Sequence, residues 1–227
     1  TLKTNLYKKA QISLLMSKKE LWHLIIALIL LTIVISFSQL IKNNPAYLTT
    51  AFFFALLILI FNVGAKKWIA SSLDASVEHE IWHASRTGFK PGQHTRNKIP
   101  VGAIFPLLLT AFSTGIIKCM TMLTYETSAL KRRAARRFGP YSFTEMTDWH
   151  NALVGAAGII GTLVLAFVSY WIPILQGLPT LAVYYAFWNL VPISKLDGTQ
   201  IYMGSRFLYY VLAIITIIAT LATFVIV

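Results

Sequence analysis

The chain has 227 residues, of which 56% are hydrophobic and only 12% are charged, with a mean hydropathy of +0.65 and a formal net charge of +12. A soluble domain has about 25% charged residues, so the composition excludes an ordinary soluble protein. Nucleic-acid binding would need a basic face on a folded domain, and the charge instead indicates a membrane protein with cytoplasmic loops rich in Lys and Arg. The single cysteine, Cys119, excludes an internal disulfide.

Five apolar runs are long enough to cross a bilayer, which takes about 20 mostly apolar residues. A basic amphipathic tail over residues 1–20 precedes them and is typical of a helix lying on an anionic membrane surface. A sixth run, Leu178–Ile193, is shorter. We therefore predict an all-α polytopic protein of the cell membrane, with about five to seven membrane segments. The five runs are Leu21–Ile41, Tyr47–Ala65, Val101–Leu123, Ala152–Leu175 and Phe207–Val227.

The stretch Trp68–Ala84 differs from these runs. It contains no Pro or Gly and is compatible with a helix, but it carries three acidic residues and two histidines. A helix facing lipid would not tolerate that load. We therefore expect a helix that lines a cavity enclosed by protein or lies near an aqueous surface.

The run Val101–Leu123 contains two glycines and a proline, which predict either a kinked span or a segment that enters and leaves on one side. Charge placement favours the re-entrant arrangement. If the chain from Lys66 to Ala152 stays cytoplasmic, Lys42 is the only one of 20 Lys and Arg outside, whereas two full spans would violate the positive-inside tendency more often. The basic cluster Lys131–Arg137 then lies in a cytoplasmic loop, with lipid headgroup binding as the alternative.

The sequence His79-Glu80-Ile-Trp-His83 matches H-E-x-x-H. Residues four apart share a face of a helix, so both imidazoles can reach one metal ion with Glu80 beside the open coordination position as general base. A catalytic zinc site needs a third protein ligand. The candidates within or beside apolar segments are Asp197, Glu78, His23, Cys119 and His150.

Asp197 is the strongest of these candidates. It closes the run AFWNLVPISKLDG, in which Pro192 and Gly198 break the helix and expose backbone polar groups. Membrane proteins tolerate such backbone only inside protein or around water. Glu78 adjoins His79 and would point about 100° away from it on a helix, so we expect a solvated or supporting group there.

H-E-x-x-H followed far downstream by Asn189-Leu-Val-Pro-Ile-Ser-Lys-Leu-Asp197-Gly resembles the site-2 protease family of intramembrane zinc metalloproteases. The resemblance implies one Zn²⁺ held by His79, His83 and Asp197, with Glu80 as general base and Asn189 positioning the substrate carbonyl or its oxyanion. It also implies transmembrane protein substrates and an active site nearer the cytoplasmic side. Two N-terminal helices (21–65) would precede the protease core (66–204), and a C-terminal helix (205–227) would follow it.

The chain departs from that family in two places. Trp82 stands where the family often has Gly, and the family's A-G-P-x-x-N segment is matched only by Ala157-Gly158, with Ile159 and Thr162 in place of Pro and Asn. The glycines of this segment still permit close helix packing. These departures bear on substrate handling more than on metal binding.

Other functions stay open from the sequence. The alternative nearest to a protease is a catalytically inactive, metal-binding membrane scaffold or chaperone of the same fold. Intramembrane aspartyl chemistry lacks a G-x-G-D motif, and serine chemistry has only Gly204-Ser205 to support it. A transporter would more often show paired repeats with broken spans. The sequence leaves the oligomeric state open.

Overall fold

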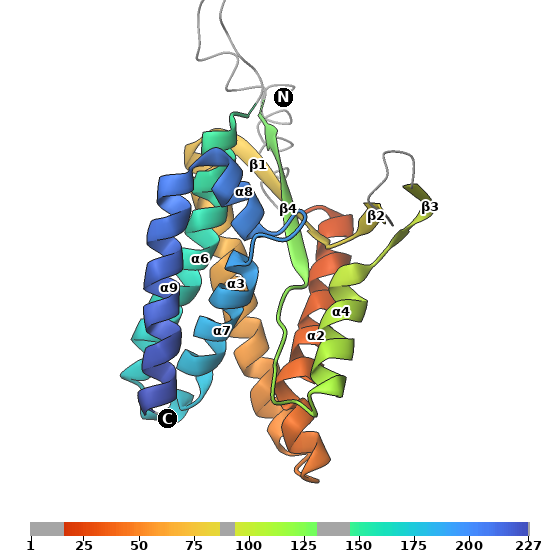
Figure 1. Cartoon of the computed structure of the whole chain (residues 1–227), viewed down its shortest axis with the longest axis vertical. Helices are drawn as coiled ribbons and strands as arrows, with labels where there is room; N and C mark the ends of the chain where they lie inside the picture. The colour runs from red at the N-terminus through yellow and green to blue at the C-terminus, as the bar shows by residue number, and fades with distance from the viewer. Residues whose placement is uncertain (1–15, 87–93, 131–145, 227) are drawn as a thin grey trace, which may run out of the picture.

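The helices run roughly along the long axis of the molecule, with the strands gathered near one end (Figure 1). The computed structural model describes residues 16–86, 94–130 and 146–226, so the predicted tail before residue 16 and the basic cluster Lys131–Arg137 lie outside the described residues. The α-helices are α2 (Lys18–Ile41), α3 (Tyr47–Ser72), α4 (Val101–Phe112), α6 (Asp148–Tyr170), α7 (Leu178–Leu190), α8 (Asp197–Gly204) and α9 (Arg206–Ile226); the strands are β1 (Ala75–Ile81), β2 (Ala84–Arg86), β3 (His94–Ile99) and β4 (Leu123–Ala129).

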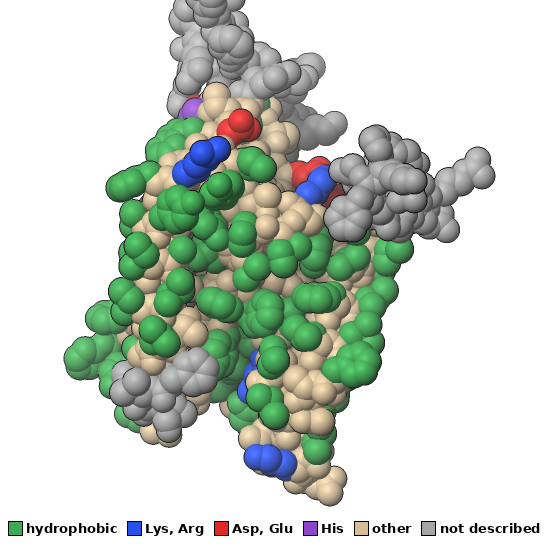
Figure 2. All heavy atoms as spheres, viewed as in Figure 1, with side chains coloured by type: hydrophobic (Ala, Val, Ile, Leu, Met, Phe, Trp, Pro, Cys, Tyr) green, Lys and Arg blue, Asp and Glu red, His purple; other side chains and the backbone are tan. Residues whose placement is uncertain are grey.

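Four of these helices, α2, α3, α6 and α9, are long and apolar enough to cross a membrane. The prediction of a multi-pass membrane protein is confirmed at this level. Figure 2 shows hydrophobic side chains over the middle of the face in view, with acidic side chains near the end that carries the strands. Such an apolar middle fits the hydrocarbon layer of a bilayer.

Helix α3 is central to the packing, since it contacts both α2 and α6, and α7 then packs on α6 and α9. Fully buried Leu31, Ile58 and Leu178 belong to the core that joins these helices. Two helices begin at side-chain caps: Ser17 Oγ accepts from the Glu20 amide at α2, and Thr147 caps α6 in the same way. Such caps satisfy amide groups that have no partner within the helix.

The predicted helix over Trp68–Ala84 is wrong. Helix α3 continues to Ser72, Asp74 adopts a positive φ of 51°, and β1 follows. An L-residue in the left-handed region ends a helix. Beyond it, side chains alternate between buried and more exposed positions from Ala75 to Ile81, a period of two that suits a strand with one buried face. The expectation of an all-α fold is therefore corrected to a mostly helical fold with two small antiparallel sheets, β1–β4 and β2–β3.

The run Val101–Leu123 does not form a single span. Helix α4 ends at Phe112, a turn with positive φ at Thr114 and Gly115 reverses the chain, and an extended segment returns to β4 (Figure 1). The turn lies against α2, because a Cβ on Gly115 would come within 2.8 Å of the Ser38 backbone nitrogen. The segment thus runs away from the sheet and back to it, which is the shape expected of a re-entrant segment.

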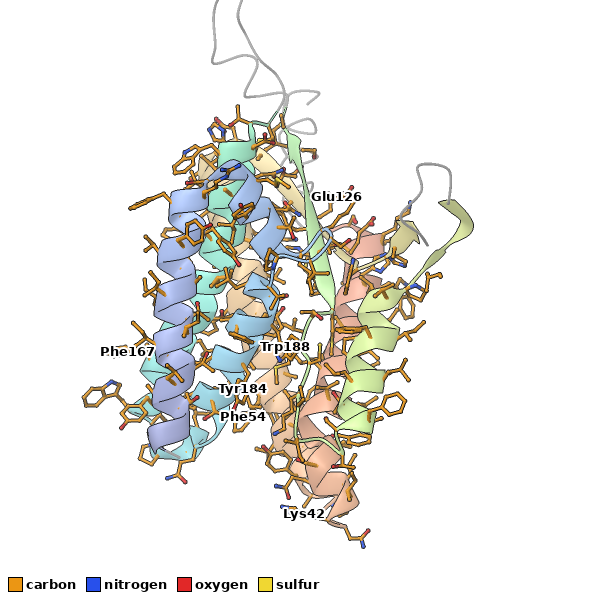
Figure 3. The ribbon with its side chains drawn as sticks, in the orientation of Figure 1. Lys42, Phe54, Glu126, Phe167, Tyr184 and Trp188 are labelled. Atoms are coloured by element: carbon orange, nitrogen blue, oxygen red, sulfur yellow. The ribbon has the colours of Figure 1, made fainter. Side chains whose placement is uncertain are left out.

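The strands and α8 lie at the same end of the molecule (Figure 1). Lys42 lies at the opposite end from Glu126 of β4 (Figure 3). The predicted arrangement likewise puts Lys42 on the side away from the segment 66–152, and it stays a prediction. The end that carries the strands and α8 also holds the residues expected to form the site.

Candidate functional site

The H-E-x-x-H residues lie on and just after β1 rather than on one helix face. His79 is fully buried on the inner face of β1, whereas Glu80 lies on the outer face and is only half-buried. Successive side chains of a strand point to opposite faces. Glu80 therefore points away from the imidazole that it was expected to assist.

His79 is held by a carboxylate of α2. Its Nδ1–H donates to Glu20 Oε1 over 2.8 Å, and Lys67 Nζ of α3 donates to Glu20 Oε2 over 2.8 Å. Burial lowers the pKa of His79 to about 4, with Lys66 and Lys67 acting in the same direction and Glu20 opposing them. His79 is therefore neutral at neutral pH. Its Nε2 has no hydrogen-bond partner in the described part of the chain.

His83 meets a different residue of α2. Its ring lies edge-on to the ring of His23, with 6.2 Å between centroids. Glu20 and His23 are three residues apart on α2 and so share a face of that helix. The two histidines of the motif thus both contact this face and join β1 and the residues after it to α2.

Asp197 is the first residue of α8 and is fully buried. Its Oδ2 lies 2.6 Å from Nζ of Lys66, a lysine of α3 that is only 1% exposed. The ammonium group also lies 4.7 Å from the ring centroid of Tyr125 on β4. Burial raises the pKa of Asp197 and the neighbouring Lys66 counteracts that shift. The carboxylate expected to bind zinc has a lysine as its cation.

One helical turn before Lys66 stands Asn62, which is 1% exposed. Neither its Oδ1 nor its Nδ2 has a hydrogen-bond partner among the described residues. Helix α6 comes very close here, because a Cβ on Gly158 would lie 2.4 Å from Lys66 Cε and 3.0 Å from Asn62 Nδ2. The predicted close packing at the α6 glycines is confirmed. Asn62 and Lys66, at i and i+4 on α3, share the face that meets Asp197.

Asn189 is buried in α7, and its Nδ2 donates to the carbonyl oxygen of Tyr185 in the same helix over 2.8 Å. Cys119 is buried with its Sγ 3.3 Å from Thr121 Oγ1. Glu78 is exposed on the outer face of β1, directly opposite Glu126 of β4. The other two candidates for the third ligand, His23 beside His83 and His150 beside Thr147, also have neighbours other than Asp197.

The described residues do not bring His79, His83 and Asp197 together into one cluster. Within residues 16–86, 94–130 and 146–226, no group of three or more His, Cys, Asp and Glu side chains is placed to hold one. His79, His83 and Asp197 each have a separate neighbour, namely Glu20, His23 and Lys66. The sequence interpretation missed Asn62 and Lys66. The signal for them was the lysine pair that directly follows the apolar run Tyr47–Ala65, with no Pro or Gly between them to end the helix.

A polar groove borders the edge of β4 that faces away from β1, where no other strand pairs with it in the described part of the chain. It has a volume of about 430 Å³, and its lining includes Glu126, Thr127, Asn151, Lys195 and Gln200. Gln200 Nε2 donates to the Tyr125 carbonyl oxygen over 3.0 Å, and Lys195 Nζ lies 3.3 Å from Glu126 Oε1. The groove therefore combines an open strand edge with polar side chains of α6 and α8.

Comparison with known proteins adds no relative: no model of a protein family, no curated protein and no solved structure matches this chain.

Proposed function

We propose that this chain is a non-hydrolytic membrane protein in which the ammonium group of Lys66 stands in the place of a catalytic metal ion, and that it acts by binding extended segments of other polypeptides. The observation that carries the proposal is the 2.6 Å contact between Lys66 Nζ and Asp197 Oδ2. The aspartate of the L-D-G motif meets a helix with functional side chains four residues apart. Those side chains are Asn62 and Lys66, and neither is a zinc ligand of the usual kind.

Electrostatics favours lysine over metal at this position. A divalent ion about 4 Å from an ammonium group is repelled by roughly 8 kcal/mol at an effective dielectric constant of about 20. Lys66 also lies within Coulomb range of His79 and disfavours its protonation. A zinc ion shared by Asp197 and His79 would have to displace this lysine from a buried site in which the lysine already neutralises the carboxylate.

The edge of β4 that borders the groove supports peptide binding. Just beyond the two ends of the β1–β4 pair, the Trp82 N–H donates to the Met122 carbonyl oxygen and the Leu130 N–H donates to the Asp74 carbonyl oxygen. Both bonds continue the pairing of β1 with β4, and hydrogen-bonded pairs recur at every second residue, so the even-numbered residues of β4 form the hydrogen-bonded pairs with β1. The backbone groups of odd-numbered residues, such as Thr127, therefore point toward the groove. An extended peptide can add to such an edge through main-chain hydrogen bonds.

A zinc metalloendopeptidase is the second candidate, and the unpartnered Nε2 of His79 favours it. His79, His83 and Asp197 would hold the zinc, with Glu80 as general base and Asn189 positioning the substrate carbonyl. This candidate needs a rearrangement that frees Asp197 from Lys66. When bound, the metal would supply an activated water for hydrolysis of transmembrane protein substrates.

Metal analysis distinguishes the two candidates. We expect the purified full chain, dialysed against zinc, to retain less than about 0.1 zinc per chain, against about one for a catalytic site. Neither the parent nor Glu80→Gln should cleave a model membrane peptide. One zinc per chain that is lost in Asp197→Ala, together with cleavage lost in Glu80→Gln, would establish the protease instead.

Peptide binding is tested at the edge of β4 with a fluorescein-labelled decapeptide of alternating Val and Thr. Proline is tolerated on an edge strand where its missing N–H would face outward, so Thr127→Pro removes one outward donor. We expect it to weaken binding by about tenfold or more, and Thr127→Ala, which keeps the amide, by less than about threefold. Equal binding by both variants would refute the edge as the binding site.

A further inference from the structure

An apolar groove of about 740 Å³ runs along the outer side of the α3–α6 pair, with Leu208 of α9 at its border. Its lining is apolar except for Ser72, which lies where α3 ends beside the strands. Phe61 and Trp68 rise from α3 and Ile160 and Val164 from α6, all four more than a third exposed. This groove is separate from the buried Lys66–Asp197 pair and from the polar groove at β4.

Gly64 makes the groove deep, and contacts with the described residues do not account for a glycine at this position. A Cβ built on Gly64 meets no atom within 4 Å, whereas a Cβ on Gly161 would lie 2.7 Å from the Ala65 side chain. Gly161 is thus needed for close approach of the two helices. Glycine in the middle of a helix is less favourable than alanine, so Gly64 has a conformational cost without a packing reason inside the described chain.

The length of the groove distinguishes between possible occupants. It extends from Ile60 to Leu73 along α3 and from Leu153 to Val164 along α6, which at 1.5 Å per residue is about 20 Å and about 17 Å. Half of a bilayer's hydrocarbon core is roughly 15 Å thick. A transmembrane helix would need a contact face through both leaflets, whereas the groove covers about one leaflet. Ser72, the only polar residue of its described lining, lies at the end near the strands.

We propose that the groove binds one hydrocarbon chain of a membrane lipid from the leaflet on the side of the strands. The chain lies over Gly64, between the walls formed by Trp68 and Val164, with the lipid headgroup at the Ser72 end. Its contacts are dispersion contacts with apolar side chains, so the site selects for chain shape and not for headgroup charge. The proposal is independent of whether the protein hydrolyses or binds peptides.

The test uses the full chain in vesicles of phosphatidylcholine that carries a diazirine either near the carbonyl or near the methyl end of one acyl chain. After irradiation, cross-linked residues are mapped by mass spectrometry. We expect the shallow probe to label residues near Leu73 and Leu153 and the deep probe to label residues near Ile60 and Val164. The deep probe should label the region of Ile60, which is 55% exposed, about fivefold or more above that of Ile218 on α9, which is 61% exposed.

Gly64→Leu fills the groove from a position where an added Cβ meets no described atom within 4 Å. Gly64→Ala is the matched control that adds only one methyl group. Leucine should lower groove labelling by about fivefold or more and alanine by less than about twofold, with an unchanged or raised unfolding temperature in both. Equal labelling of groove and Ile218, or labelling unaffected by leucine, would overturn the proposal. A cross-linked second copy or a foreign transmembrane helix in the groove would also overturn it.

Discussion

Replacing Lys66 by methionine leaves the fully buried Asp197 without its cation. Both side chains are no more than 2% exposed and Nζ lies 2.6 Å from Oδ2, so solvent does not screen the loss. Removing one partner of a buried ion pair costs about 3–5 kcal/mol of unfolding free energy. Because burial raises the pKa of Asp197, its folded-state pKa lies above its unfolded value. Without Lys66, the buried Asp197 carboxyl group costs the least free energy in its protonated form. The free energy of unfolding lost in Lys66→Met therefore grows as pH rises.

The measurement is unfolding of the full chain in mixed detergent and SDS micelles, followed by tryptophan fluorescence at pH 5 and pH 8. The matched control is Lys195→Met, because Lys195 and Glu126 are 68% and 66% exposed and such a pair contributes at most about 1 kcal/mol. The double variant Lys66→Met/Asp197→Asn should lose less than the two single variants together, by about 2 kcal/mol or more. A loss below about 1 kcal/mol in Lys66→Met, or strict additivity, would refute the buried pair.

Three further predictions concern the same region. The folded-state pKa of His79 is about 4 against an ordinary value of 6.5, so the stability that neutral His79 contributes is present above pH 6.5 and is lost as pH falls toward 4. A pH series of the free energy of unfolding should show a loss of roughly 3 kcal/mol that is absent in His79→Gln. Gly158→Val should lower the free energy of unfolding by about 1–3 kcal/mol through overpacking against Lys66, and an unchanged midpoint in the same micelle assay would contradict this. Asn62→His/Lys66→His places two imidazoles one turn apart facing Asp197, and elemental analysis should then find about one zinc per chain; no gain over the parent would show that this face cannot hold a metal.

The membrane character and the helix positions were predictable because they depend on local composition. Four predicted spans correspond to helices that are long and apolar enough to cross the membrane. The boundary at Ala65 was wrong because two lysines follow it. Helix α3 continues through Lys66 and Lys67 because each meets a buried carboxylate, Asp197 and Glu20, from distant parts of the chain. Such long-range neutralisation leaves no signal in a local window of sequence.

The strand in place of the expected helix had a signal in the sequence. In Ala75–Ile81 the odd positions hold Ala, Val, His and Ile, and the even positions hold Ser, Glu and Glu, which is the alternation of a half-buried strand. The H-E-x-x-H pattern was interpreted with the helical period instead. A motif implies its chemistry only on the element that gives it the right geometry, and on a strand His79 and Glu80 face opposite ways.

The buried ionisable groups of this interior balance one another in charge. Lys66 and Lys67 are adjacent on α3, so their side chains leave the helix about 100° apart and neutralise Asp197 and Glu20 separately. With His79 neutral, these groups carry no net charge, and a divalent ion would add charge instead of balancing it. Zinc affinity is therefore expected to rise only when Lys66 loses its charge. Zinc titrations of the parent and of Lys66→Met test this: equal affinity in the two would show that the lysine does not occupy the place of the cation.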